Sequence, residues 1–271
     1  MKEYSINKLE NKAKEIRRTV VDMIYRAKSG HIGGSLSMVE MLVALYYYKM
    51  NVDPSTPYWP ERDRFVLSKG HTAPAYYAIL ADKGYFSQDW LYHEYRRINS
   101  RLQGHPDCRK TPGVDMSAGS LGIGLSTACG MAIGAKRTGR AFQTYVVLGD
   151  GEINEGEIWE AAMFAAFYQL DNLTVLVDKN NMQNDGFTAD VMDMGDIKEK
   201  WDSFGWKTYQ VDGHCIQAII NALDGPNQGK PKIIICETVK GKGVSFMESN
   251  IKFHGGCPSS EEYQQAMKEL A

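Results

Sequence analysis

Hydrophobic positions along the chain follow two spacings. In the first thirty residues, apolar side chains recur every three or four positions, which predicts one amphipathic helix that stops near Gly30. Further on, short apolar runs rich in β-branched or aromatic residues predict strands at 64–68, 144–149, 173–178 and 232–238. The helical positions are Leu9, Ala13, Ile16, Val20, Ile24 and Ala27, and further helical patterns lie between the strands at 73–83, 121–137 and 155–170.

Strands that alternate with helices predict an α/β fold, with a mostly parallel sheet flanked by helices on both faces. A length of 271 residues is enough for one such domain, and no repeat, low-complexity tract or long linker divides it. We therefore predict a single domain over 1–271. The stretch 96–119 contains several turn-forming residues and is too long to be a mere connection, so we expect a functional loop there.

Charge and composition exclude several classes of partner. The 31 basic residues nearly match the 33 acidic ones, so the overall charge favours neither nucleic acid nor an anionic membrane. The chain shows no apolar leader and no run of 18 apolar residues, which predicts a soluble cytoplasmic protein. Five cysteines without a C-x-x-C pair indicate reduced thiols, and we expect all five to be packing residues.

The main chemical signal is Gly-Asp-Gly after one predicted strand and Asp-Lys-Asn-Asn at the end of the next. The carboxyl ends of neighbouring parallel strands lie about 4.8 Å apart at one edge of a sheet, so Asp150 and Asn180 could reach one small cation. Oxygen ligands favour Mg²⁺ or Ca²⁺, and Mg²⁺ held by few protein groups commonly completes its shell with phosphate oxygens. Gly149 and Gly151 would let a phosphate approach the backbone. The alternative is a bare tight turn followed by an Asn-rich loop.

Histidine positions strengthen the ligand interpretation. Alone, each histidine is more typical of a capped turn or a solvated surface. Together, they indicate imidazoles presented from loops where the backbone approaches a ligand closely, and imidazoles supply hydrogen bonds and proton transfer near pH 7. Five of the six touch a glycine, namely His31, His71, His105, His214 and His254.

These motifs resemble the N-terminal third of transketolases. The spacing of "GDG" and "NN" resembles the motif that binds thiamine diphosphate and its metal ion. The resemblance extends from the first helix to about residue 258. Its other blocks, in order, are "KSGHIGG", "DRFVLSKGH", "QGHPD", "GSLGIGLSTACGMA", "GDGEINEGEIWEA", "DKNNMQNDG", "DGH" and "KGKGVSFME" followed by "FHG".

The resemblance implies roles for individual residues. Asp150, Asn180 and the main-chain carbonyl of Met182 would coordinate Mg²⁺ or Ca²⁺. The diphosphate would be held by Gly151, His71 and His254, and the thiazolium ring would lie beside Gly119, Ser120 and Leu121. The catalytic imidazoles would be His31, His71, His105 and His254, and Glu155 would lie between subunits and take part in communication between the active sites.

Some positions depart from the family pattern. Ile32 stands where many transketolases have proline, Lys69 replaces an asparagine, and Lys240 with Lys242 fill a segment that is usually less basic, so substrate contacts could differ. His214 matches a family position without an implied catalytic duty, and we expect it to be structural.

The resemblance also implies an activity and a partner chain. Transketolases transfer a two-carbon ketol unit from a ketose phosphate to an aldose phosphate and serve the pentose phosphate pathway. In whole subunits this module is followed by one that binds the pyrimidine ring and supplies an activating glutamate. We therefore expect a C-terminal subunit on a separate chain, an α₂β₂ assembly, and no activity from this chain alone. The helix containing "WEAAMFAAF" would either serve a subunit contact or only pack on the sheet.

Two alternatives stay open. One is another thiamine-diphosphate enzyme of similar plan, such as a sulfosugar transketolase or a relative that makes deoxyxylulose phosphate. The other is a non-catalytic regulatory subunit that keeps the fold. Nucleotide enzymes are disfavoured because "GPNQGKP" lacks the Walker spacing and "GSLGIG" follows a loop rather than a strand.

Overall fold

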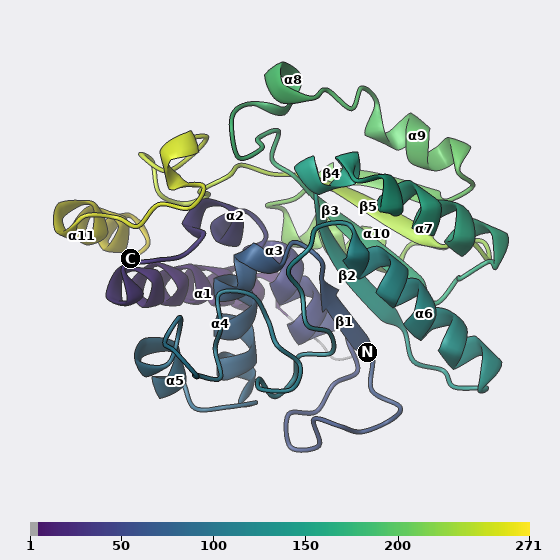
Figure 1. Cartoon of the computed structure of the whole chain (residues 1–271), viewed down its shortest axis with the longest axis horizontal. Coiled ribbons are helices and arrows are strands. Elements are labelled where there is room, and N and C mark those ends of the chain that lie inside the picture. Colours follow the sequence, from purple (N-terminus) through teal and green to yellow (C-terminus); the bar gives the residue numbers. More distant parts are fainter. Residues whose placement is uncertain (1–4) are drawn as a thin grey trace.

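A five-stranded parallel sheet forms the centre of the protein (Figure 1). The computed structural model describes residues 5–271. The strand order is β1-β2-β3-β5-β4, and every neighbouring pair is parallel, which confirms the predicted sheet. The strands are β1 (Arg64–Leu67), β2 (Thr144–Gly149), β3 (Leu173–Lys179), β4 (Lys207–Asp212) and β5 (Lys232–Glu237).

Strand β4 was not among the predicted strands, for a physical reason. This strand lies at the edge of the sheet and pairs only with β5, and it contains no continuous apolar run. Only Thr208 along it is buried, whereas β2, β3 and β5 are buried over most of their length. An edge strand that is covered on one side leaves a weak hydrophobic signal.

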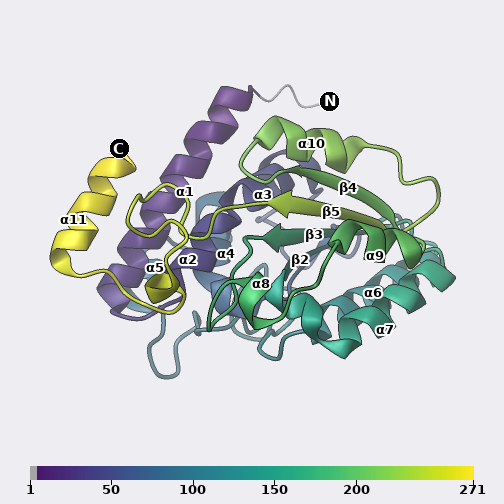
Figure 2. The ribbon, with the colours of Figure 1, turned by 90° about the horizontal axis from the view of Figure 1, so that it is seen from above.

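Helices cover both faces of the sheet, as predicted (Figure 2). Alternate strand residues such as Val146 and Val147 point into separate hydrophobic cores. One core includes α6 (Ile123–Arg137), α7 (Gly156–Phe167) and α9 (Ile197–Ser203). The other includes α1 (Ile6–Ala27), α2 (Ile32–Ser37), α3 (Val39–Val43), η1 (Ala44–Lys49), α4 (Ala73–Lys83), α5 (Asp89–His93), α10 (Ile216–Asp224) and α11 (Ser260–Glu269).

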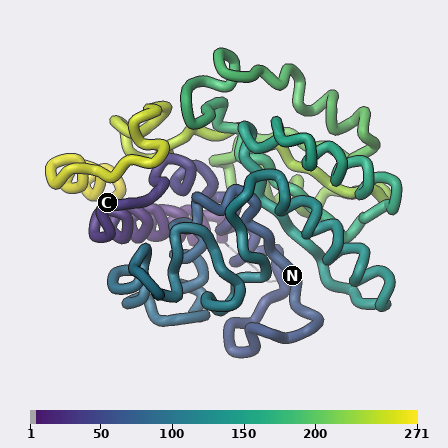
Figure 3. The backbone as a smooth tube through the Cα atoms, viewed as in Figure 1, coloured from purple at the N-terminus to yellow at the C-terminus, as the bar shows by residue number. Residues whose placement is uncertain are grey.

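The helices follow the predicted periodicity closely. The six apolar positions predicted on α1 pack into its core, and the helix ends at Lys28, which adopts a left-handed conformation two residues before Gly30. Helix α4 matches the predicted 73–83 and ends at Gly84, whose φ of 91° allows its N–H to close the last turn. Figure 3 shows α1 beside α11, where Tyr25 and Tyr263 stack with centroids 4.0 Å apart.

The carboxyl ends of β1, β2, β3 and β5 all meet at one edge of the sheet. The register sets Gly149 of β2 beside Asp178 of β3, so the loops that follow start close together. The segment 96–119 contains no helix or strand and runs to the same region, as predicted.

Two further expectations can be compared with the structure. Within residues 5–271 no helix is long and apolar enough to cross a membrane. Cys129 and Cys236 are buried, as expected for packing residues, but Cys215 is exposed at the start of α10, so the prediction is wrong for that residue.

Candidate active site

A cavity of about 490 Å³ opens at the carboxyl edge of the sheet. It receives residues from the loops after β1, β2, β3 and β5 and from the long loop before α6. Of the residues predicted for the site, only Ser120 is not on the cavity wall. The predicted residues that line the cavity are His31, His71, His105, Gly119, Leu121, Asp150, Gly151, Glu155, Asn180, Met182 and His254.

Asp150 presents a buried carboxylate at the tip of β2. The residue is 2% exposed, and its oxygens accept hydrogen bonds from the backbone N–H of Gly151 at 2.9 Å and of Asn181 at 2.6 Å. Burial, together with the charge of Asp178, raises the pKa of the Asp150 carboxyl to about 6. No cationic side chain of residues 5–271 forms an ion pair with it. A bound cation would therefore supply the charge that this carboxylate lacks.

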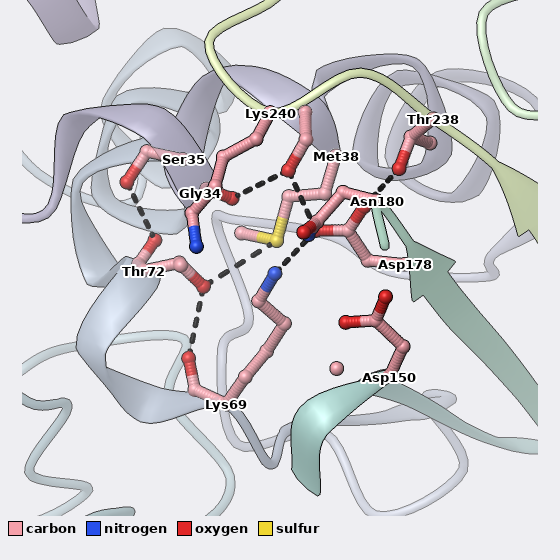
Figure 4. A network of polar contacts seen from close by, with 12 residues as sticks. Gly34, Ser35, Met38, Lys69, Thr72, Asp150, Asp178, Asn180, Thr238 and Lys240 are labelled. Atoms are coloured by element: carbon pink, nitrogen blue, oxygen red, sulfur yellow. Dashed lines mark hydrogen bonds and ion pairs between the residues drawn. The ribbon is translucent and has the colours of Figure 1, made fainter. Parts of the chain in front are cut away.

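Asn180 and Met182 bring further oxygen atoms to the same wall (Figure 4). The Asn180 Oδ1 atom accepts a hydrogen bond from the Met182 N–H at 3.1 Å, and the Met182 carbonyl lies 3.5 Å from Lys240 Nζ. A carboxylate, an amide and a carbonyl make a hard-oxygen set of the kind that suits Mg²⁺ or Ca²⁺. Within residues 5–271 no group of three His, Cys, Asp or Glu side chains could hold a metal, so this oxygen set is the site that we propose.

Asp178 belongs to an ion pair beside the candidate metal site. Its carboxylate is fully buried and accepts hydrogen bonds from Lys69 Nζ, Ser37 Oγ and Thr238 Oγ1. Burial raises the pKa of the Asp178 carboxyl, but the charge of Lys69 and these hydrogen bonds outweigh burial and hold that pKa below its usual value. Lys69 thus has its counterion within the protein.

Lys240 is a buried cation without such a counterion. It is 3% exposed, and within residues 5–271 no carboxylate lies within ion-pair distance of it. Its ammonium donates to His254 Nδ1 at 2.7 Å. Burial, and then the charge of Lys69, lowers the pKa of Lys240 to about 8, so it stays largely protonated at pH 7. A buried positive charge on a cavity wall fits an anionic ligand.

Three imidazoles form a triangle beside Lys240. The ring centroids of His31, His71 and His254 lie 5.1 to 5.7 Å apart. Burial, followed by nearby positive charge, lowers the pKa of His31 and His254 to about 4 and that of His71 to about 2. All three rings are therefore neutral at pH 7 and act as hydrogen-bonding groups rather than as cations. His105 lies at the more exposed rim of the cavity.

Glu152 is a site residue that was not predicted from the sequence. Its buried carboxylate accepts hydrogen bonds from Ser68 Oγ, from the Gly122 N–H at 2.9 Å and from the Gly149 N–H at 3.0 Å. It therefore joins the ends of β1 and β2 to the start of α6. Burial raises its pKa. The only sequence signal was a second acidic residue directly after Gly-Asp-Gly.

His214 lies outside the cavity, consistent with the structural role expected for it. Its Nδ1 lies 3.2 Å from Glu40 Oε2, and its Nε2 accepts a hydrogen bond from the Val239 N–H at 2.9 Å. Glu40 in turn pairs with Arg17 at 2.6 Å. This chain of contacts ties the loop that carries Lys240 to α1 and α3.

An open parallel sheet with a polar cavity at its carboxyl edge defines a cofactor-binding α/β domain. Comparison with known proteins specifies which one. Residues 9–271 match the family model described as transketolase, thiamine diphosphate binding domain. The chain therefore belongs to the transketolase family and represents its thiamine-diphosphate-binding domain.

Similar proteins include chains of the same length and longer ones. One of the two named subunits of this length belongs to the apulose-4-phosphate transketolase of Actinobacillus succinogenes and is 44% identical, over 98% of this chain and 97% of that protein. The 6-deoxy-6-sulfo-D-fructose transketolase subunit SqwG of a Clostridium strain is also 44% identical, over 100% and 98%. The crystal structure of Campylobacter jejuni transketolase superposes with a TM-score of 0.93 at 29% identity, over 98% of this chain and 43% of that one.

Proposed function

We propose that this chain is the N-terminal subunit of a two-chain, thiamine-diphosphate-dependent transketolase. The enzyme would transfer a two-carbon ketol unit from a ketose donor to an aldose acceptor. The observation that carries this proposal is one cavity wall that holds an oxygen ligand set at Asp150, Asn180 and Met182 next to the buried cation of Lys240. A metal-bound diphosphate needs both features.

Each part of the cavity would hold a different part of the cofactor. Asp150, Asn180 and the Met182 carbonyl would bind Mg²⁺ or Ca²⁺, and Lys240, His71, His254 and the Gly151 backbone would bind the diphosphate. When bound, thiamine diphosphate supplies the electron sink for breaking a carbon–carbon bond. Gly119 leaves open space on the cavity wall, since a Cβ there would meet no atom within 4 Å, and this suits the approach of a ring.

The imidazoles would act on the sugar. A neutral imidazole donates from one nitrogen and accepts at the other, so His31 and His105 can hold a hydroxyl group or move a proton to or from a carbonyl oxygen. Their neutral state near pH 7 also keeps the positive charge of the cavity on the lysines. The sequence proposal that these histidines are catalytic stays a prediction, as does the role of Glu155 between subunits.

A separate partner chain is supported by the names of the relatives. Two relatives that this chain matches over almost their whole length are named as subunits. We propose that a C-terminal subunit completes each site in an α₂β₂ assembly, and that this chain alone is inactive. A single domain over 1–271 and a cytoplasmic location also stay predictions.

The exposed side of α7 is a candidate contact with another subunit. Its alanines at 161, 162 and 165 pack on the sheet, while Met163, Phe164 and Phe167 face solvent. We expect Phe167→Glu to weaken assembly at least about tenfold, because an apolar contact cannot accommodate a charge without loss. Light scattering on the co-purified pair over a range of concentrations measures this.

Tyr58→Glu is the matched control for Phe167→Glu. Tyr58 is 76% exposed and Phe167 is 79% exposed, but Tyr58 lies on the loop before β1. The control should assemble as the unchanged chain does. Assembly of both variants at wild-type strength would show that the side of α7 is merely exposed.

The substrates are proposed from the relatives. One relative is named for apulose 4-phosphate and another for 6-deoxy-6-sulfo-D-fructose, and both names describe sugars with a terminal anion. We propose a phosphorylated or sulfonated ketose as donor, with pentose phosphate metabolism as one setting to test. A non-catalytic subunit is the weaker alternative, because the ligand set and the imidazoles are all in place.

Reconstitution tests the proposed function. The chain and its partner are purified together and assayed with phosphorylated and sulfonated ketoses and an aldose acceptor. Product formation should require both chains, thiamine diphosphate and a divalent ion. Cofactor binding without ketol transfer from any donor would instead favour the regulatory alternative, and the donor profile separates the transketolase types.

A further inference from the structure

Arg96 is a half-buried guanidinium behind the cavity that forms no ion pair within residues 5–271. It does not line the cavity. Its Nη1 donates to Ser29 Oγ at 2.8 Å and its Nε donates to Tyr95 Oη at 3.2 Å. The third contact joins Nη2 to His31 Nδ1 at 3.4 Å. The side chain is thus held by two neutral oxygens and directed at one edge of an imidazole.

The surrounding backbone holds this guanidinium in place. Arg96 has a φ of 56°, and its N–H donates to the Leu102 carbonyl at 2.9 Å. On the other side, a Cβ at Gly104 would lie only 3.2 Å from the guanidinium Cζ, Nε and Nη2 atoms. Glycine at 104 therefore lets the loop close over Arg96, and the guanidinium has little room to leave His31.

We propose that Arg96 is a positioning residue that fixes the tautomer of His31. An arginine can only donate, so His31 Nδ1 must be the acceptor and the ring proton must lie on Nε2. Within residues 5–271 no hydrogen bond engages Nε2, which lies on the other side of the ring, near the Gly255 backbone. Nε2–H is therefore the donor that His31 offers to a ligand.

The charges around His31 act in the same direction. Burial, and then the charges of Arg96, His105 and Lys240, lower the pKa of its ring. The rings of His71 and His254 also face it, at 5.1 and 5.6 Å. Arg96 thus has two effects on His31, since its positive charge disfavours the imidazolium and its N–H selects one of the two neutral forms.

Nitrogen NMR of the full chain with ¹⁵N-labelled histidine tests this inference. Long-range ¹H–¹⁵N spectra show which ring nitrogen carries the proton, and a His31→Gln variant assigns the signal. The wild-type ring should carry its proton on Nε2 throughout the range of about pH 5 to 8. In Arg96→Met we expect a mixture of tautomers and a His31 pKa higher by about one unit. Arg97→Met, an exposed neighbour, is the matched control and should change neither.

Clear outcomes would overturn the inference. They are a proton on Nδ1 in the wild type, or an unchanged tautomer in Arg96→Met. Should that variant fail to fold, the double variant Ser29→Ala/Tyr95→Phe removes the two anchors, and an unchanged tautomer there has the same meaning.

The value of this tautomer for catalysis rests on the proposed function, whereas the NMR result does not. In the reconstituted enzyme, Arg96→Met should lower kcat by roughly 10-fold to 100-fold while cofactor affinity is unchanged. An altered tautomer with unchanged kcat would show that the tautomer does not serve the reaction. Absence of activity in the wild-type pair would count against the proposed function alone.

Discussion

Replacement of Asp150 by alanine is expected to abolish the Mg²⁺-dependent part of thiamine diphosphate binding. Asp150 is the only carboxylate in the proposed ligand set, and its pKa of about 6 shows how strongly burial without a cation disfavours its charge. Loss of residues that merely support metal ligands costs roughly 10-fold to 100-fold in affinity, so we expect at least a 100-fold loss here. Calorimetry on the co-purified pair, with and without Mg²⁺, measures this.

The control for Asp150→Ala is Asp190→Ala, which removes an exposed carboxylate of the following loop. Its affinity should match that of the unchanged protein, and circular dichroism of both variants should show the native fold. If Asp150→Ala bound the cofactor with wild-type affinity and the same response to Mg²⁺, Asp150 would not be a metal ligand. In that case the proposed set of Asn180 and Met182 would also lose its charged member.

The fold was predictable from the sequence where burial is complete. Strands such as β2, β3 and β5 are buried from both sides, so continuous apolar runs marked them. Edge strand β4 needs burial on one side only, and its polar positions hid it. Helix ends were predicted less well, since α1 stops at Lys28 instead of Gly30. That stop depends on a left-handed lysine, and no glycine marks the position.

The candidate site was predicted through loops whose order along the chain conceals their proximity. Asp150 and Asn180 could be placed together because parallel strands end at one edge. The partners of Asp178 could not be inferred, because Lys69, Ser37 and Thr238 come from three other segments. The same is true of Arg96, which reaches His31 only because the loop containing Gly104 folds over it. Such contacts depend on tertiary packing, which no spacing records.

The buried pair of Lys69 and Asp178 leads to the largest expected effect on stability. Lys69→Met would leave the fully buried Asp178 carboxylate without its cation. Removing one partner of a buried ion pair costs about 3–5 kcal/mol in free energy of unfolding. For a domain of this size we expect a melting temperature lower by about 10 °C. Lys198→Met is the control, because it breaks an exposed pair with Asp202 and should change the free energy by less than about 0.5 kcal/mol.

The pH dependence of the Lys69→Met deficit separates loss of the charge pair from loss of packing. In the unchanged protein the pKa of Asp178 is held below its usual value, so its contribution to stability is present above the unfolded-state pKa and is lost only as pH falls through the lower folded value. Without Lys69, burial dominates and the folded pKa rises above the unfolded one, so the variant is penalised most at neutral pH. Urea unfolding at several pH values should therefore show a deficit that shrinks as the solution is acidified from pH 7 to pH 4. A deficit independent of pH would mean that the lysine stem, rather than its charge, stabilises the fold.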